Sequence, residues 1–313
     1  MDSPPPPWTD LARPPLRAAA LRAALVTGPA AVWRDVEVVA STGSTNADVA
    51  ERARAGAREG LVLVADDQRA GRGRLGRSRE LPPRSGLAVS VLLRPGSAGN
   101  RSAGTADDAL PGDRLPAVEA SRWSWLPLVA GVAAVDALTR VAGLPARLKW
   151  PNDVLVPPDG RPGADPDALA KVCGILAEVV TTPTGPAVVL GAGINVSQQR
   201  SELPVPTATS LLLAGSATTD RDTVLRAYLR ALADRYRAWR AASGDPRASG
   251  IGAAYREACV TIGRQVAVHL PSGEPLTGCA EGVDDDGRLL LSGADGRPRA
   301  LAAGDVVHVR PPT

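Results

Sequence analysis

The chain has 313 residues, of which 44% are hydrophobic, so it is long enough for one large domain with its own core and one small domain. Its formal net charge is +3, with 36 Lys and Arg against 33 Asp and Glu spread along the length, which argues against a dedicated nucleic-acid binder. Three distant cysteines without a C-x-x-C pair, and no apolar leader or membrane-length apolar run, predict a cytoplasmic protein with no membrane partner.

The first third of the chain is expected to lead from a flexible extension into a catalytic domain. Residues 1–34 are Pro-rich and then Ala/Arg-rich, which predicts a flexible extension with one short helix at most, at LRAALV. The catalytic domain is assigned to residues 35–258. It opens with a strand, a Ser/Thr/Gly-rich turn, and a helix capped by Ser44 or Thr45. Residues 60–68, GLVLVADDQ, predict the next strand.

A glycine pattern follows that strand. Gly71, Gly73 and Gly76 spell the G-x-G-x-x-G of a dinucleotide-binding turn, but Pro82 and Pro83 stand where the required helix would run. The loop instead carries four arginines in and beside the glycines: Arg72, Arg74, Arg77 and Arg79. A glycine-permitted loop with several guanidinium groups is typical of a segment that closes over a polyanionic ligand.

The rest of the chain predicts alternating strands and helices, then a change of character. Residues 97–122 have no apolar period and are expected to form a disordered insertion. A buried helix is expected over 123–144, ending at Gly143, and a second helix over 222–243 closes the domain. Residues 259–313 alternate short apolar strands with PSG, DDDG and ADG turns, which predicts a small antiparallel β-barrel or sandwich.

Lysine and asparagine are rare in this chain. Only Lys149 and Lys171 among the 36 cationic residues are lysine, and asparagine occurs four times. Where almost every lysine has been replaced by arginine, the two that remain are candidates for positions that arginine cannot fill. The same reasoning selects Asn46, Asn152 and Asn195, since the fourth asparagine lies in the expected insertion.

Five short motifs follow one another in the chain: GSTN (43–46), DQRAGRGRLGR (67–77), KWPNDV (149–154), KVCGILAE (171–178) and GAGINV (191–196). In this order and with these residues they resemble the biotin protein ligases, of the monofunctional type without an N-terminal DNA-binding domain. The resemblance runs from about residue 36 to 196 and continues more weakly to the C-terminus. It implies an α+β fold, in which a mixed, mostly antiparallel sheet carries helices as in class II aminoacyl-tRNA synthetases, and a C-terminal SH3-like barrel.

The resemblance also implies the reaction and its participants. Biotin and ATP, with Mg²⁺, would form biotinyl-5′-AMP, and biotin would then pass to one lysine of the biotin carboxyl carrier domain of an acyl-CoA carboxylase. Such an enzyme needs no histidine or cysteine nucleophile, because the reacting carboxylate belongs to biotin. The resemblance implies no specific nucleic-acid partner, allows a homodimer and leaves the oligomeric state open.

The site residues are carried over motif by motif. The catalytic residues are expected to be Lys171, Arg72 and Arg74. The biotin-binding residues are expected to be Ser44, Thr45, Asn46, Gln68, Arg72, Gly73, Arg74, Lys171 and Gly174. The ATP-binding residues are expected to be Arg72, Arg74, Lys149, Asn152, Asp153, Lys171, Gly193 and Asn195, with Asp153 also at the metal corner. Trp150 is expected in the core, and a solvent-facing position is the alternative for Glu178.

Two departures and two alternatives accompany this interpretation. The family's aromatic residue after the arginine loop is missing here, and the stretch between Asp153 and Lys171 is lengthened by what is expected to be a surface loop. A lipoate or octanoate ligase or transferase shares the fold, but its linear acyl chain would need an apolar pocket. A biotin-responsive DNA-binding repressor needs an N-terminal winged helix of ~60 residues, and fewer than 40 residues precede the expected catalytic domain.

Overall fold

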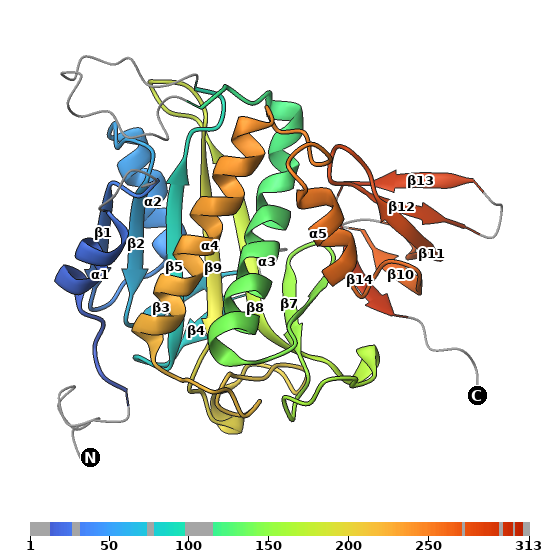
Figure 1. Ribbon diagram of the computed structural model, residues 1–313, viewed down its shortest axis with the longest axis horizontal. Helices are drawn as coiled ribbons and strands as arrows, with labels where there is room; N and C mark the ends of the chain where they lie inside the picture. The colour runs from blue at the N-terminus through green and yellow to red at the C-terminus, as the bar shows by residue number, and fades with distance from the viewer. Residues whose placement is uncertain are drawn as a thin grey trace.

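The computed structural model describes residues 13–26, 32–73, 78–97, 115–270, 273–293, 297–302 and 304–308. Its centre is a seven-stranded sheet in the order β1-β2-β5-β9-β8-β7-β6 (Figure 1). The β1–β2 pair is parallel and every other pair in this sheet is antiparallel, so the predicted mixed, mostly antiparallel α+β fold is confirmed. The strands are β1 (Asp35–Val39), β2 (Leu61–Ala65), β5 (Gly86–Leu93), β6 (Arg147–Lys149), β7 (Asp153–Val156), β8 (Ala170–Val180) and β9 (Ala187–Asn195).

Helices cover both faces of this sheet unequally. One face carries α3 (Leu126–Ala137) and α4 (Arg221–Ala241), with α1 (Ala18–Leu25) and α5 (Ile251–Ala258) at its sides (Figure 1). The other face carries α2 (Thr45–Arg54). Strands β2, β5 and β9 are apolar nearly throughout because both of their faces are buried.

The buried helix predicted over 123–144 is confirmed with added detail. It consists of a 3-10 turn (Ala120–Trp125), α3 and a π-helical turn (Leu138–Ala142), and it ends at Gly143, whose φ is 67°. This segment is long and apolar enough to cross a membrane, but 67% of its most apolar window is buried inside the fold. It is therefore a core helix.

The N-terminal residues that the structure describes are packed, contrary to the flexible extension expected over 1–34. Leu21 and Leu25 lie one turn apart on α1 and are both buried against the core. Trp33 is 1% exposed, and its indole N–H donates to the Leu229 carbonyl of α4 at 3.0 Å. Residues 1–12 and 27–31 lie outside the described residues.

The expected disordered insertion over 97–122 is wrong for its last part. Val118 is 1% exposed and accepts a hydrogen bond from the Trp123 indole at 2.9 Å. The Arg240 guanidinium of α4 donates to the carbonyls of Leu115 and Pro116 at 2.8–3.0 Å. A buried cation therefore orders a segment whose sequence carries no period of its own, and residues 98–114 lie outside the described residues.

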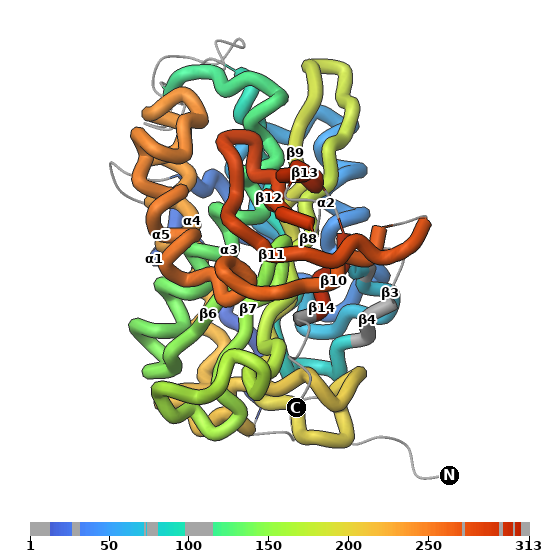
Figure 2. Tube along the Cα trace, turned by 90° about the vertical axis from the view of Figure 1, so that its right-hand side faces the viewer, coloured from blue at the N-terminus to red at the C-terminus, as the bar shows by residue number. Residues whose placement is uncertain are grey.

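Residues 259–308 form the C-terminal module, a five-stranded antiparallel sheet in the order β13-β12-β11-β10-β14, which confirms the predicted small β-domain. It packs at the β6–β7 end of the central sheet and faces the viewer in Figure 2. The Trp125 and Trp150 indoles donate to the carbonyls of Asp285 and Gly287 in its DDDG turn. Its strands are β10 (Gln265–His269), β11 (Leu276–Val283), β12 (Leu289–Ser292), β13 (Pro298–Leu301) and β14 (Asp305–His308). A separate pair, β3 (Gln68–Arg72) and β4 (Ser78–Leu81), carries the start of the arginine loop.

Candidate active site

A cavity of about 570 Å³ lies on the α2 face of the central sheet. Its floor is a row of residues in register across five strands: Ala88, Gly193, Gly174, Asp153 and Lys149. The first three positions, Ala88, Gly193 and Gly174, have small side chains or none, so the floor is flat where a ligand would cross the sheet. The charged residues stand at the β7–β6 end of the row.

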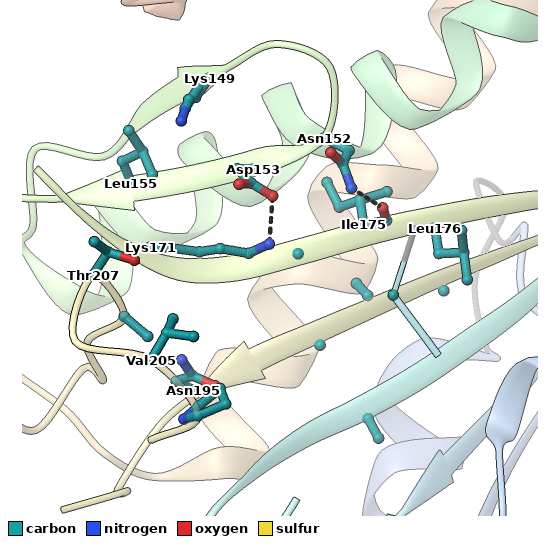
Figure 3. Close-up of a pocket in the computed structure, with 18 of the residues that line it drawn as sticks. Lys149, Asn152, Asp153, Leu155, Lys171, Ile175, Leu176, Asn195, Val205 and Thr207 are labelled. Atoms are coloured by element: carbon teal, nitrogen blue, oxygen red, sulfur yellow. Dashed lines mark hydrogen bonds and ion pairs between the residues drawn. The ribbon is translucent and has the colours of Figure 1, made fainter. Parts of the chain in front are cut away.

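A β-bulge brings Lys171 to this floor. Lys171 and Gly174 are three residues apart on β8, and a regular strand would turn their side chains to opposite faces. The register between β7 and β8 shifts between Val154 and Leu155, so Asp153 pairs with Gly174 while Leu155 pairs with Lys171. The extra residue in β8 thus turns Lys171 onto the same face as Asp153 (Figure 3).

Lys171 and Asp153 form the ionic centre of the cavity. Lys171 Nζ lies 2.5 Å from Asp153 Oδ1, and the two side chains are 36% and 24% exposed (Figure 3). Lys149 lines the cavity from the next strand, and Asn152 is held by a 2.8 Å hydrogen bond from its Nδ2 to the Ile175 carbonyl. Solvent reaches the Lys171 ammonium, and among the described residues it pairs with the Asp153 carboxylate. It can therefore bind an incoming anion without leaving a buried charge unpaired.

The opposite end of the cavity is polar and uncharged. Ser44 caps α2 by accepting from the Ala47 N–H, as predicted. Gln68 Oε1 accepts from both the backbone N–H and the hydroxyl of Thr45, at 3.0 and 3.1 Å. Ser90 Oγ lies 2.7 Å from Thr45 Oγ1 and 2.6 Å from Asn46 Oδ1. The side chains at this end are therefore held in fixed orientations before any ligand binds.

Glu178 and Gly191 fix the position of Asn46. Glu178 Oε2 accepts from Asn46 Nδ2 at 2.6 Å; because a carboxylate only accepts, this contact determines which way the amide faces. Glu178 is solvent-exposed, as the alternative interpretation had it, yet it also orients a residue that lines the cavity. A Cβ on Gly191 would lie 2.2 Å from Asn46 Oδ1, so this glycine makes room for the Asn46 amide.

One wall of the cavity is a loop that pairs with Lys171. The Lys171 N–H donates to the Thr207 carbonyl at 2.9 Å, and the Thr209 N–H donates to the Lys171 carbonyl at 2.8 Å. Asn195 is 4% exposed; its Nδ2 donates to the Thr209 carbonyl at 2.7 Å and its Oδ1 accepts from Gln198. The Asn195 amide therefore anchors the wall, although the residue also lines the cavity as expected.

The C-terminal module closes the charged end. Asp305 and Val307 of β14 line the cavity, and Arg264 Nη1 lies 2.5 Å from Asp167 Oδ1. Asp167 belongs to the lengthened stretch between β7 and β8, which is a surface loop that also lines the cavity. The sequence offered no signal for this contact, since it joins segments about a hundred residues apart.

The structure gathers most of the expected site residues in this one cavity. These are Ser44, Thr45, Asn46, Gln68, Gly73, Lys149, Asn152, Asp153, Lys171, Gly174, Gly193 and Asn195. Arg72 ends β3, but its side chain lies outside what the structure describes, and Arg74 lies outside the described residues altogether. Ser90 was missed, although a lone serine inside the apolar run GLAVSVLL is a signal that could have found it.

The side chains near Asp153 determine which kind of metal site can form at the expected position. Within the described ranges, no three His, Cys, Asp or Glu side chains come together as a metal site. Mg²⁺ in nucleotide sites is commonly held by one or two carboxylates, with phosphate oxygens and waters completing its shell. A single Asp153 carboxylate fits such a shared site, and it does not fit a metal bound by protein alone.

Sequence comparisons relate this chain to known proteins. Residues 112–195 match the Biotin/lipoate A/B protein ligase family, and residues 261–309 match the Biotin protein ligase C terminal domain. The biotin–acetyl-CoA-carboxylase ligase of Mycobacterium tuberculosis is 41% identical over 305 residues, which cover 96% of this chain and 98% of that protein. The bifunctional ligase/repressor of Bacillus subtilis is 30% identical, over 89% of this chain and 74% of that protein.

Solved structures agree with the sequence comparisons. The biotin protein ligase of Aquifex aeolicus in complex with biotin and ATP superposes with a TM-score of 0.65 at 26% identity, over 89% of this chain and 100% of that one. The biotin protein ligase of Leishmania major in complex with biotinyl-5-AMP has a TM-score of 0.51 at 19% identity and shares the fold.

Proposed function

The chain belongs to the biotin protein ligase family, and from this we propose that its cavity joins biotin to ATP and then transfers biotin to a partner protein. In the first step a biotin carboxylate oxygen attacks the α-phosphorus, a P–O bond forms, and pyrophosphate leaves. In the second step a lysine amine of the carrier domain of an acyl-CoA carboxylase attacks the acyl carbon. An amide forms, AMP leaves, and the amine gives up a proton.

The observation that carries this proposal is the Lys171–Asp153 pair at one end of a cavity whose other end is polar and uncharged. The first step brings a carboxylate against a phosphate, so two negative charges must approach each other. Lys171 exchanges part of its contact with Asp153 for these oxygens and neutralises the charge that spreads over the phosphoryl group. Because its backbone is held by the wall loop, the ammonium is positioned before the substrates arrive.

The polar end suits the ureido ring of biotin. This ring presents two N–H donors and one carbonyl acceptor, and the hydroxyl and amide side chains of Ser44, Thr45, Asn46 and Gln68 provide matching partners. Their mutual hydrogen bonds fix which atoms face the ligand. A lipoate or octanoate ligase is disfavoured, because a linear acyl chain would leave these polar groups unpaired.

The nucleotide is proposed to lie at the charged end. Lys149 of β6, Asp153 of β7 and Asn152 in the turn between these strands line this end. Gly193 lets the nucleotide approach the sheet, and Asn195 acts through the wall loop. Asp153 would hold Mg²⁺ together with the triphosphate, and the ion would supply further neutralisation of phosphate charge. Gly73, Gly174, Arg72 and Arg74 complete the proposed ligand contacts, the two arginines from the loop that closes over biotinyl-5′-AMP.

The cellular compartment of the enzyme is inferred from its substrate and its cysteines. The reaction consumes ATP, and the described cysteines are free, with Cys173 and Cys259 buried, which supports a cytoplasmic enzyme.

The test is a transfer assay with the purified protein, ATP, Mg²⁺, labelled biotin and a carboxylase carrier domain. Label is expected on the carrier, dependent on ATP, and absent when the target lysine of the carrier is replaced by arginine. Transfer of lipoate in place of biotin would refute the proposal. A gel-shift assay should show no sequence-selective DNA binding that survives moderate salt.

A further inference from the structure

The N-terminal strap, residues 13–26, lies outside the five motifs and does not line the cavity. Its helical part, α1, packs through Leu21 and Leu25 against the core. Its first two residues, Arg13 and Pro14, extend beyond that packing and reach segments that border the cavity. The contacts of these two residues are therefore more than the docking of a helix requires.

Arg13 binds the turn at the start of segment 197–209. This segment contains the wall loop, in which Thr207 and Thr209 pair with Lys171. Its Nη1 and Nη2 lie 2.9 and 2.6 Å from the two carboxylate oxygens of Glu202, a two-point contact, and Nη2 also donates to the Ser197 carbonyl at 3.0 Å. The two side chains are 17% and 27% exposed. The hydrogen bonds from Arg13 lower the pKa of Glu202, because they stabilise its charged form.

The turn held by Arg13 is continuous with the wall beside Lys171. Arg200, in the same 3-10 turn as Glu202, donates to the Ala208 carbonyl at 2.6 Å. Ser210 Oγ donates to the Gln198 carbonyl at 2.8 Å. Thr207 and Thr209 then make the two backbone hydrogen bonds to Lys171. The Arg13–Glu202 contact, the hydrogen bonds within segment 197–210 and the two backbone hydrogen bonds to Lys171 thus connect the strap to the proposed catalytic lysine.

Pro14 joins the strap to the opposite border of the cavity. Its carbonyl accepts from Arg221 Nη2 at 2.7 Å, and Arg221 Nη1 lies 2.8 Å from Asp66 Oδ1. Arg221 is 5% exposed, so this is a buried ion pair whose geometry the fold must keep. Asp66 stands two residues before Gln68, where the chain enters the biotin end.

We propose that the strap is a positioning element of the ligase site, in which Arg13, through Glu202, holds segment 197–209 against Lys171. Its catalytic consequence rests on the proposed function, whereas its structural consequence does not. Displacement of a catalytic group by about 1 Å from a remote change can lower the rate about a hundredfold, so this tether matters for turnover. Lysine cannot replace Arg13 fully, because it lacks the planar two-point contact.

The structural test is hydrogen exchange of the full chain, read by mass spectrometry over segment 197–209. Arg13→Ala is expected to speed exchange in this segment by about tenfold or more, as local opening becomes easier. Arg22→Ala is the matched control, because it removes an ion pair from the same strap, with Asp35 at 2.9 Å, that touches neither border of the cavity. Equal exchange in the two variants would overturn the proposal.

The catalytic test is biotin-dependent pyrophosphate release with ATP and Mg²⁺. Arg13→Ala is expected to lower kcat/KM for ATP about tenfold while biotin affinity changes less than about twofold, and Arg13→Lys should recover part of the loss. The double variant Arg13→Ala/Glu202→Ala should lose less than the sum of the two single variants, because the Arg13–Glu202 contact is removed in all three. Each single variant also removes one separate hydrogen bond, from Arg13 to the Ser197 carbonyl or from the Gln199 N–H to Glu202. Losses that add in the double variant, or a loss confined to biotin affinity, would overturn the proposal.

The two tests separate the possible failures. A wild-type protein that releases no pyrophosphate with biotin would refute the proposed function, and the exchange experiment would still decide whether Arg13 holds segment 197–209.

Discussion

Lys171 is the residue whose chemistry is most demanding. It presents a compact ammonium 2.5 Å from Asp153, in a cavity where a carboxylate and a phosphate must meet. Arginine is a wide planar group and does not fit that position. Elsewhere in the chain it is the usual cation: of the 36 Lys and Arg residues, all but the two lysines are arginine. Lys171→Arg is expected to fold normally and to raise the barrier to adenylate formation by about 2–4 kcal/mol.

The measurement for Lys171→Arg is biotin-dependent pyrophosphate release beside a thermal melt. Lys149→Arg is the comparison, and it should cost less, because Lys149 stands on the edge strand β6 and the Asp153–Lys171 ion pair stays intact. Near-normal turnover by Lys171→Arg would show that its assignment as a catalytic residue is wrong.

Gly191 is a residue whose function lies in its missing side chain. In Gly191→Ala the new Cβ would stand 2.2 Å from Asn46 Oδ1, so the amide must move and lose its bonds to Ser90 and Glu178. Biotin affinity is expected to fall about tenfold, the equivalent of one or two hydrogen bonds. Titration calorimetry with biotin measures this, and Gly282→Ala, where a Cβ would meet open space, is the neutral control. Unchanged biotin affinity in Gly191→Ala would contradict the role given to Asn46.

The rarity of lysine and asparagine in the sequence identified single residues of the cavity better than the chemistry of their side chains alone. The two lysines and the three selected asparagines all line one cavity. The sequence could not assign their contacts, because Asn195 uses its amide to hold a backbone carbonyl and Gly191 accommodates Asn46. Both facts depend on which strands pair, and that pairing is set by tertiary packing.

At the scale of the element, most helices and strands were predictable and their irregularities were not. The helix stop at Gly143 and the cap at Ser44 follow from local chemistry. The bulge in β8 that turns Lys171 into the cavity has no signature in KVCGILAE, because a bulge depends on the partner strand. The order of residues 115–118 likewise depends on Arg240, which is more than a hundred positions away.

Helix α4 contains the clearest stability prediction. Arg240 is 1% exposed and pairs with Glu59 at 3.3 Å, while the Tyr236 hydroxyl, whose pKa is raised by burial, donates to the same carboxylate at 2.6 Å. Arg240→Leu would remove the guanidinium that pairs with Glu59 and donates to the carbonyls of Ser97, Leu115 and Pro116. The free energy of unfolding is expected to fall by about 3 kcal/mol, measured by urea denaturation.

Arg237→Leu is the control for that variant. Arg237 stands on the same helix, 4.0 Å from the largely exposed Asp234, and its removal should change stability by less than about 1 kcal/mol. The KM for biotin should be unchanged in both variants, because neither residue lines the cavity. A small effect of Arg240→Leu would show that the buried guanidinium does not hold residues 115–118.

At the scale of the whole molecule, the small antiparallel sheet at the C-terminus was predictable and its docking was not. The change to short strands near residue 260 indicates a separate module. Nothing in the DDDG turn indicates that its carbonyls accept from the indoles of Trp125 and Trp150, which are both 2% exposed. The consequence is a cavity with walls from both parts of the chain, including Asp305 and Val307 of β14.

Among the described residues, the ion pairs between the module and the catalytic domain differ in their distance from the cavity. Arg264 pairs with Asp167, which lines the cavity, and both side chains are mostly buried. Arg247 pairs with Asp285 at 3.1 Å, where the side chains are 80% and 53% exposed. Arg264→Gln should therefore loosen the charged end of the cavity. Arg247→Gln also removes an ion pair between the module and the catalytic domain, but that pair lies away from the cavity.

Arg264→Gln is expected to raise the KM for ATP several-fold and to leave kcat nearly unchanged. The variant separates two cavity walls that contact the bound substrate, and it does not move Lys171. Partial exposure limits the loss of stability to about 1 kcal/mol. Steady-state pyrophosphate release at saturating biotin, with melting curves for both variants, measures the two effects. If Arg264→Gln and Arg247→Gln gave the same KM, the module would be a passive neighbour of the site, and Asp305 and Val307 would lie beside the bound nucleotide without contributing to its affinity.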